Sequence, residues 1–264
     1  MLTLTNVRKT FNKGTINEKV ALAGINLHLD RGDFVTVIGG NGAGKSTMLN
    51  MIAGVYPLDS GTITLDGNDI SLLSEHARAR YLGRVFQDPM RGTAADMQID
   101  ENLALAMRRG KSRTLRWGIT KEEREQYASE LANLGLGLET RLSDKVGLLS
   151  GGQRQALTLL MATLQRPDLL LLDEHTAALD PKTASLVLDL TQRIVDEEGL
   201  TTLMVTHNMH DAIRMGNRLI MMADGKVIYD VRGEEKARLH RADLMAKFEE
   251  AAGQELDNDR MLLG

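Results

Sequence analysis

Hydrophobic and polar positions alternate in three stretches near the start of the chain. The stretches cover residues 2–7, 25–29 and 61–66, and turn-forming residues separate them. Alternation with a period of two places the apolar side chains on one face of an extended strand. These stretches therefore predict half-buried strands, and the turn residues between the first two indicate antiparallel pairing.

Three other stretches are short, nearly continuous apolar runs. They cover Phe34–Ile38, Leu169–Leu172 and Thr202–Val205. Runs of this length are typical of strands that are buried on both faces. The segment 182–196, between the second and third runs, has a helical pattern. Strand, helix and strand at this spacing predict a parallel α/β sheet.

Helical periodicity also follows the first buried run and fills the middle of the chain. A helix is predicted from Ser46, with Gly54 as its C-terminal cap. Residues 97–107 and 122–134 have helical patterns as well. We expect residues 88–161 to form an inserted helical subdomain.

The end of the chain predicts a hairpin and then a helix. Residues 221–230 form the hairpin pattern, with Asp224-Gly225 as its turn. We assign residues 1–231 to one domain and residues 232–264 to a helical tail. The tail is expected to pack on its own domain, and a regulatory contact is the alternative. Its predicted apolar positions are Leu239, Ala242, Met245 and Phe248.

Composition narrows the classes of function. Of the 264 residues, 42% are hydrophobic and 26% are charged, which is ordinary globular usage. The absence of cysteine excludes disulfides, thiolate metal sites and cysteine nucleophiles. A net charge of −4 and only 3% aromatic residues give no support to nucleic-acid binding. No apolar run approaches the length of a membrane span or of a signal-peptide core. We therefore expect membrane association only through a partner.

The residues after the first buried run match a phosphate-binding loop. They read G-G-N-G-A-G-K-S, which fits the pattern G-x-x-x-x-G-K-[ST]. Glycines let the backbone N–H groups converge on phosphate oxygens, the lysine reaches the β- and γ-phosphates, and the serine hydroxyl ligates Mg²⁺. The predicted binding residues are Gly39, Gly40, Asn41, Gly42, Ala43, Gly44, Lys45, Ser46 and Thr47.

The second buried run ends in two acids, Asp173 and Glu174. Ligands bind at the carboxyl ends of strands in open parallel sheets. With a phosphate loop upstream, Asp173 is predicted to hold the Mg²⁺ shell and Glu174 to polarise the water that attacks the γ-phosphate. A helix cap is the alternative interpretation of these acids.

Residues 149–153 read L-S-G-G-Q and open a helical run, which predicts a second anion site at a helix N-terminus. One mononucleotide needs only one phosphate loop, so a second anion site in the same chain needs an explanation. The motif closely resembles the signature of the ATP-binding cassette family, and the resemblance covers residues 2–230. In that family two cassettes dimerise head to tail, and each signature loop closes on ATP held by the other subunit. The resemblance thus implies that Ser150, Gly151, Gly152 and Gln153 bind ATP.

The resemblance also implies roles for isolated residues. Gln87 would sense Mg²⁺, and His207 would contact the γ-phosphate, so both join Glu174 as catalytic residues. Asp180 would cross the dimer interface. Phe11 would stack on adenine, with a core phenylalanine as the alternative. The implied metal ligands are Ser46, Gln87 and Asp173.

The fold implied is α/β: a P-loop NTPase (RecA-like) core with an antiparallel β subdomain and an inserted α-helical subdomain. The activity implied is hydrolysis of Mg·ATP coupled to transmembrane permease subunits, with a second copy of the chain and a solute-binding protein as partners. The protein would lie at the cytoplasmic face of the cell membrane as a peripheral subunit.

The chain departs from the usual family pattern at His175, where many cassettes have proline. With this variant it looks like ATPases of tryptophan/tyrosine or other amino-acid importers. An export or lipoprotein-release system, a soluble ATPase of the same superfamily and a small-molecule kinase are the alternatives.

Residues 108–116 contain five basic residues in nine. They predict either a solvated loop or a contact with anionic headgroups or with the acidic rim of a membrane partner.

Overall fold

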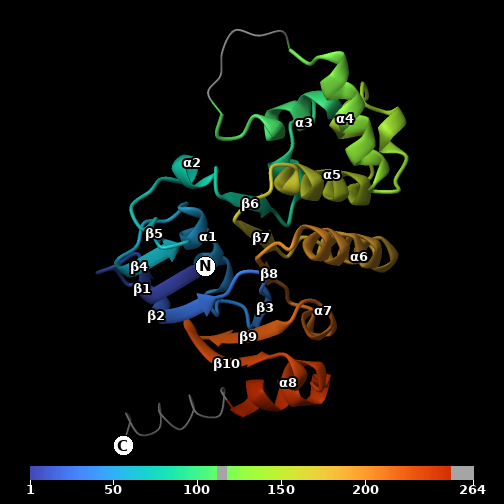
Figure 1. The fold of residues 1–264 in the computed structure, drawn as a ribbon. Coiled ribbons are helices and arrows are strands. Elements are labelled where there is room, and N and C mark those ends of the chain that lie inside the picture. The colour runs from blue at the N-terminus through green and yellow to red at the C-terminus, as the bar shows by residue number, and fades with distance from the viewer. Residues whose placement is uncertain (112–117, 251–264) are drawn as a thin grey trace, which may run out of the picture. The chain divides into compact units, whose positions relative to one another are not determined.

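The computed structural model describes residues 1–111 and 118–250. The chain forms two compact units. The first unit contains residues 1–73 and the chain from Leu203 onward, and the second unit contains residues 74–202. Each unit carries its own share of the predicted site, and the fold of each is shown in Figure 1.

The first unit contains an antiparallel sheet, in the strand order β2-β1-β4-β5. The strands are β1 (Leu2–Phe11), β2 (Lys19–Leu29), β4 (Ser60–Leu65) and β5 (Asn68–Asp69). The predicted alternation is confirmed, because the apolar positions of these stretches are buried. Val7 keeps to the buried face only because the pairing register shifts between Leu4 and Val7, where Asn6 has a φ of 48°.

A second group of strands in the first unit has the order β10-β9-β3-β8. They are β3 (Phe34–Gly39), β8 (Thr202–Val205), which enters this unit at Leu203, β9 (Arg218–Ala223) and β10 (Lys226–Arg232). β3 pairs parallel with β9, and β9 pairs antiparallel with β10. The predicted closing hairpin is confirmed.

Helix α1 (Lys45–Ala53) directly follows the phosphate-loop sequence and packs against β2 and β3. Gly54 caps its C-terminus in a left-handed conformation, as predicted. Helix α7 (Met209–Arg214) packs against β3, and the short α8 (Glu234–Ala237) packs against β10. The phosphate loop is thus held by elements of a single unit.

The tail packs on its own unit, as expected, and two of its four predicted apolar positions, Leu239 and Phe248, contact the core there. Residues 241–250 are helical, and Leu244 is fully buried in a cluster with Ile38 and Val231. Phe248, one turn further on, packs against the same cluster. The predicted face is wrong at Ala242 and Met245, which are exposed, because the helix starts after Leu239 and presents Leu244 to the sheet. The domain boundary at residue 231 stays a prediction, and residues 251–264 lie outside the described residues.

The second unit joins two parallel strands to a set of helices. β6 (Leu82–Val85) pairs parallel with β7 (Leu169–Asp173). The helices predicted in this region are confirmed as helices, and none that the structure describes is long and apolar enough to cross a bilayer. The helices are α2 (Glu75–Arg78), α3 (Ile99–Met107), α4 (Lys121–Ala132), α5 (Gly151–Thr163) and α6 (Pro181–Glu198). Short 3₁₀ turns lie at Pro89–Gly92, Leu138–Thr140 and Val146–Leu148.

The first part of the basic run is used inside the second unit. Arg109 donates to the carbonyl oxygens of Ala162 and Gln165, at 3.3 and 2.8 Å, and burial lowers the pKa of its guanidinium. Arg108 pairs with Glu123. The interpretation as a solvated loop is therefore wrong for Arg109, and residues 112–116 lie outside the described residues.

His175 is buried in the second unit, with 2% of its surface exposed. Its Nε2 lies 3.0 Å from the hydroxyl oxygen of Thr191, and that hydroxyl donates to the carbonyl oxygen of Val187. Nε2 must therefore carry the proton that the hydroxyl oxygen accepts. Burial lowers the pKa of His175 from 6.5 to about 4, so the imidazole is neutral in the folded protein.

This buried histidine predicts a loss of stability in acid. Between pH 6.5 and 4 the unfolded chain takes up a proton at His175 and the folded chain does not, so stability falls with the pH. Denaturant unfolding at pH 7.5 and pH 5 measures the effect. We expect His175 to account for a loss of about 2 kcal/mol between the two values. His175→Gln should remove that part of the loss, and His76→Gln, at an exposed position, should leave it unchanged. An equal loss in wild type and His175→Gln would contradict the assignment.

Candidate functional site

The phosphate-loop residues lie between β3 and α1, where two glycines have left-handed backbones. Gly44 has a φ of 98° and begins α1, and a Cβ placed on it would lie 2.5 Å from the carbonyl oxygen of Ala21. Gly42 has a φ of 84°. A Cβ on Gly40 would meet no atom within 4 Å. A side chain is thus excluded at Gly44 both by its left-handed backbone and by the nearby carbonyl group. Around Gly40 the space is open.

Lys45 is held within this loop. Its Nζ donates to the carbonyl oxygens of Gly39 and Gly40, at 2.8 and 3.0 Å, and only 7% of the residue is exposed. Ser46 and Thr47 follow in the first turn of α1, where backbone N–H groups have no acceptor inside the helix. A fixed ammonium, free amides and a helix dipole are the features that a site for phosphate oxygens requires.

Phe11 lies at the end of β1 and is partly exposed. The edge of its ring meets the ring of Tyr56, with the centroids 5.2 Å apart, and Nζ of Lys9 lies 5.6 Å from its centroid. Phe11 is therefore not a fully buried residue. The adenine-stacking role stays a prediction.

His207 lies in the exposed turn between β8 and α7. The backbone N–H of Thr206 donates to the carbonyl oxygen of Val37, at 3.1 Å. The end of β8 therefore lies beside the end of β3, which runs into the phosphate loop. Asn208 caps α7 and fixes the turn on its other side. The structure thus brings His207 and the phosphate loop to the same edge of the first unit's parallel strands.

In the second unit, Gln87 and the two acids share an edge in the same way. Val85 pairs with Leu172 in the parallel register of β6 and β7, so Gln87 and Glu174 each follow just beyond that pair. Glu174 has a φ of 47°, which is uncommon for a residue with a side chain and is often found at functional sites. Gln87 is exposed.

Arg84 is a residue that the sequence reasoning missed. Its guanidinium lies 3.8 Å from the carboxylate of Asp173 and stacks on the ring of Phe86, 4.5 Å from the centroid. The backbone of Phe86, which follows Arg84 by two residues, is also held in place, because Nε2 of Gln155 on α5 donates to its carbonyl oxygen. An arginine inside the buried strand L-G-R-V was the signal that could have found it.

The signature residues form the N-terminus of α5. The N–H of Gln153 donates to the hydroxyl oxygen of Ser150, and the side-chain oxygen of Gln153 accepts from the N–H of Ser150. In this capping box the Ser150 hydroxyl acts as an acceptor, so its own proton points to another acceptor. A Cβ on Gly152 would lie 2.2 Å from the side chain of Thr183, so Gly152 allows α5 to pack on α6. Ser150 and Gly151 are exposed.

Asp180 caps α6, and its carboxylate accepts from the N–H of Thr183, at 3.1 Å. Hydrogen bonds from the side chain and backbone of Thr183 hold the pKa of Asp180 below its usual value. The carboxylate is therefore ionised at neutral pH, and it already accepts a hydrogen bond from the first turn of α6.

The predicted metal ligands are all oxygen donors, which is the chemistry that Mg²⁺ prefers. Ser46 belongs to the first unit, whereas Gln87 and Asp173 belong to the second. Within residues 1–111 and 118–250, no group of three or more histidine, aspartate or glutamate side chains could hold a metal ion alone.

A groove of about 720 Å³ in the second unit is strongly basic, and we call it the basic groove. Among the described residues, its lining consists of Phe86, His76, six cationic side chains and otherwise small or apolar residues, with no carboxylate. Arg91 also stacks on Phe86, 5.1 Å from the centroid. The basic side chains are Arg80, Arg84, Arg91, Arg108, Arg109 and Lys111.

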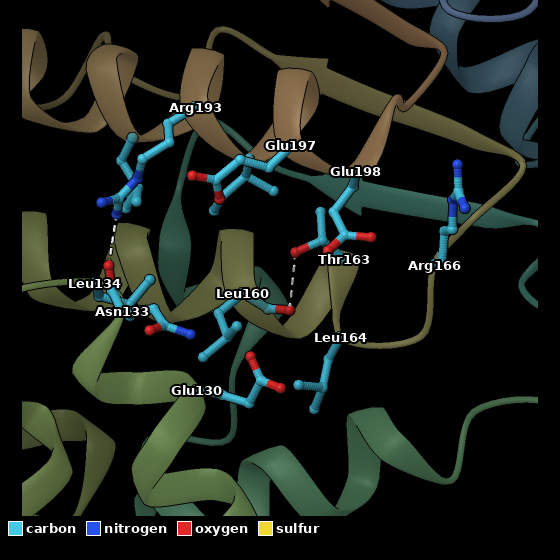
Figure 2. A pocket seen from close by; sticks show the side chains of 12 residues that line it. Glu130, Asn133, Leu134, Leu160, Thr163, Leu164, Arg166, Arg193, Glu197 and Glu198 are labelled. Carbon is cyan, nitrogen blue, oxygen red and sulfur yellow. Dashed lines mark hydrogen bonds between the residues drawn. The ribbon is translucent and has the colours of Figure 1, made fainter.

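A second cavity, of about 170 Å³, lies among α4, α5 and α6 and contains none of the predicted site residues (Figure 2). Arg193 of α6 donates to the carbonyl oxygen of Asn133, the C-cap of α4. A cation at a helix C-terminus stabilises the helix dipole. We therefore interpret this cavity as a packing gap between α4, α5 and α6 rather than as a binding site.

Comparison with known proteins gives consistent matches along the chain. A family model described as ABC transporter matches residues 22–177. The tyrosine transport ATP-binding protein of Clostridioides difficile (strain R20291) is 44% identical over 251 residues, which cover 95% of this chain and 100% of that protein. The lipoprotein-releasing system ATP-binding protein LolD 1 of Caulobacter vibrioides is 36% identical, over 86% of this chain and 94% of that protein.

A solved structure also matches. It is a dimer of an ATP-binding cassette in a post-hydrolysis state, bound to ADP and Pi. It is similar to this chain with a TM-score of 0.75 and 31% identity, over 88% of this chain and 98% of the other.

Proposed function

The chain belongs to the ABC transporter family, and from that premise we propose that it drives import of a small solute, such as an amino acid, through separate membrane subunits. It is an ATP hydrolase coupled to transport, with the α/β fold of P-loop NTPases. The use of ATP in this proposal rests on one observation, the phosphate loop, in which Lys45 is fixed by two loop carbonyl groups at the N-terminus of α1.

In this proposal the first unit binds the nucleotide. The amides of residues 39–47 and the ammonium of Lys45 hold the phosphates, and Phe11 stacks on the adenine. Stacking on a half-exposed ring contributes about 1–3 kcal/mol, by analogy with bases on aromatic side chains. The second unit supplies Glu174 and Gln87, and His207 comes from the first unit. Glu174 accepts a hydrogen bond from the attacking water, and His207 and Gln87 orient the γ-phosphate and that water.

Mg²⁺, held by Ser46, Gln87 and Asp173, would neutralise charge on the phosphate oxygens. The ion pair with Arg84 orients the carboxylate of Asp173. Asp173 thus presents oxygen atoms at the end of β7, which is what a hard cation requires.

We propose that two copies act together, head to tail. The exposed Ser150 hydroxyl has its acceptor side engaged by Gln153, so its proton is available for a phosphate oxygen of ATP on the partner copy. The dimeric ATP-binding cassette with ADP and Pi supports this arrangement.

The basic groove is the proposed docking surface for the membrane subunits. Of the six cations that line it, Arg84 pairs with Asp173 and Arg108 with Glu123, and the remaining positive charge favours an acidic segment as the occupant. Gln87 follows Phe86, which lines the groove, so a docked segment would lie close to a predicted catalytic residue. The protein would thus be held at the cytoplasmic face of the membrane as a peripheral subunit.

The transported solute is proposed from similarity. The tyrosine transport relative supports an amino acid as the solute. In an import system of this kind, a solute-binding protein would deliver the substrate. The lipoprotein-releasing relative makes export the second candidate, at lower identity.

Two substitutions should separate binding from hydrolysis. Glu174→Gln should keep ATP affinity within about twofold and lower turnover by 10²–10⁴-fold, because the water loses its acceptor. Lys45→Ala should weaken ATP binding itself, because clustered phosphate charge loses its fixed cation. Steady-state phosphate release and nucleotide titration measure the two effects, and circular dichroism checks the fold. Turnover within twofold of wild type in Glu174→Gln would contradict the role of Glu174.

The shared site predicts complementation between inactive chains. Lys45→Ala and Ser150→Arg chains should each be inactive, and a heterodimer should carry one site with both defects and one with neither. ATPase activity should therefore return in part when the two are mixed. Mixed chains that form heterodimers and stay inactive would argue against a site shared in this way.

The docking surface predicts a defect that spares hydrolysis. Arg91→Glu places a carboxylate in the basic groove and should reduce co-purification with the membrane subunits roughly tenfold through like-charge repulsion. ATP turnover of the isolated chain should stay within about twofold. Lys121→Glu, which lies outside the groove, is the matched control. Unchanged co-purification of Arg91→Glu would refute docking at this surface.

A further inference from the structure

Lys19 is the first residue of β2 and pairs with Phe11 across the β1–β2 register. Its side chain is exposed at the same end of the hairpin as the proposed adenine platform. No sequence pattern singles it out, since it precedes the alternating part of β2. Its position is defined by the fold alone.

The ammonium of Lys19 lies against the phosphate loop. A Cβ built on Gly42 would lie 3.0 Å from Nζ of Lys19 and 3.9 Å from its Cε. The lysine end therefore occupies the space that a side chain at residue 42 would take. The glycine in the middle of the loop allows this approach as well as the left-handed backbone.

Two cations thus lie along one short loop. Residues 39–46 contain no acid that could offset them. Lys45 is bound to two loop carbonyl groups, and Lys9, on the neighbouring strand, is bound to Asp59 and to the carbonyl of Pro57. For Lys19, the described residues record no hydrogen bond or ion pair. Like charges held this close favour a bound polyanion.

We propose that Lys19 is a second nucleotide-binding lysine, which contacts the phosphate chain from the β1–β2 hairpin. The inference rests on the proposed nucleotide site and adds a residue to it. Lys45 holds the phosphates from within the loop, and Lys19 reaches the loop from the sheet that carries Phe11. One hairpin thereby supplies contacts to the base and to the phosphates.

Nucleotide titration of the full chain tests this role. Lys19→Met should weaken ADP and ATP binding roughly tenfold, the effect of losing one charged hydrogen-bond donor. Lys19→Arg should stay within about threefold of wild type. Lys13→Met removes the same charge from the adjoining exposed loop and should stay within twofold.

The salt dependence of ADP binding is a second measurement, and it would not change if Lys19 had only a structural role. Raising NaCl from 0.05 to 0.5 M should weaken ADP binding less in Lys19→Met than in wild type, because one screened contact is missing. Affinity of Lys19→Met within twofold of wild type, or an equal loss in Lys13→Met, would overturn the inference. Lys45→Ala in the same titration separates the two proposals. A loss there alone would reject only Lys19, and no loss in either variant would reject the nucleotide site.

Discussion

A Cβ at Gly44 would lie 2.5 Å from the carbonyl oxygen of Ala21, so the start of α1 meets the backbone of β2 with no side chain between them. This approach fixes where α1 begins, and with it the direction of the amides that the loop presents. It also brings the antiparallel sheet against the loop, which places the Lys19 side chain beside it. The nucleotide half of the site therefore depends on contact between backbones more than on any single side chain.

In the second unit, the start of α5 is fixed by helix capping instead of by contact between backbones. Ser150 and Gln153 satisfy each other's N–H groups at the start of α5, and Gly152 lets that helix pack closely on α6. The same helix holds the carbonyl oxygen of Phe86 through Gln155, and Phe86 stacks with Arg84 beside Asp173. The signature residues, the strand end before Gln87 and Asp173 are thus linked by contacts inside one unit. A change at any of these positions is expected to disturb the others.

Local patterns predicted most of the elements, and long-range contacts explain what they missed. Runs such as Leu169–Leu172 and the glycines of the loop are dictated by burial and by backbone freedom, so they are visible in the sequence. Lys19 and Arg109 were not, because their roles come from residues far along the chain: Gly42 for Lys19, and Ala162 and Gln165 for Arg109. Ala242 and Met245 of the tail were misjudged because an exact helix start, which sets the buried face, is not encoded by apolar spacing alone.

The buried position of Leu244 has a consequence for how the chain divides. This side chain covers Ile38, which directly precedes the first glycine of the phosphate loop. All the motifs end before residue 231, yet a polypeptide cut there would leave the strand under the loop open to water. The shortest chain that contains the motifs and the shortest chain that folds around them are therefore different lengths.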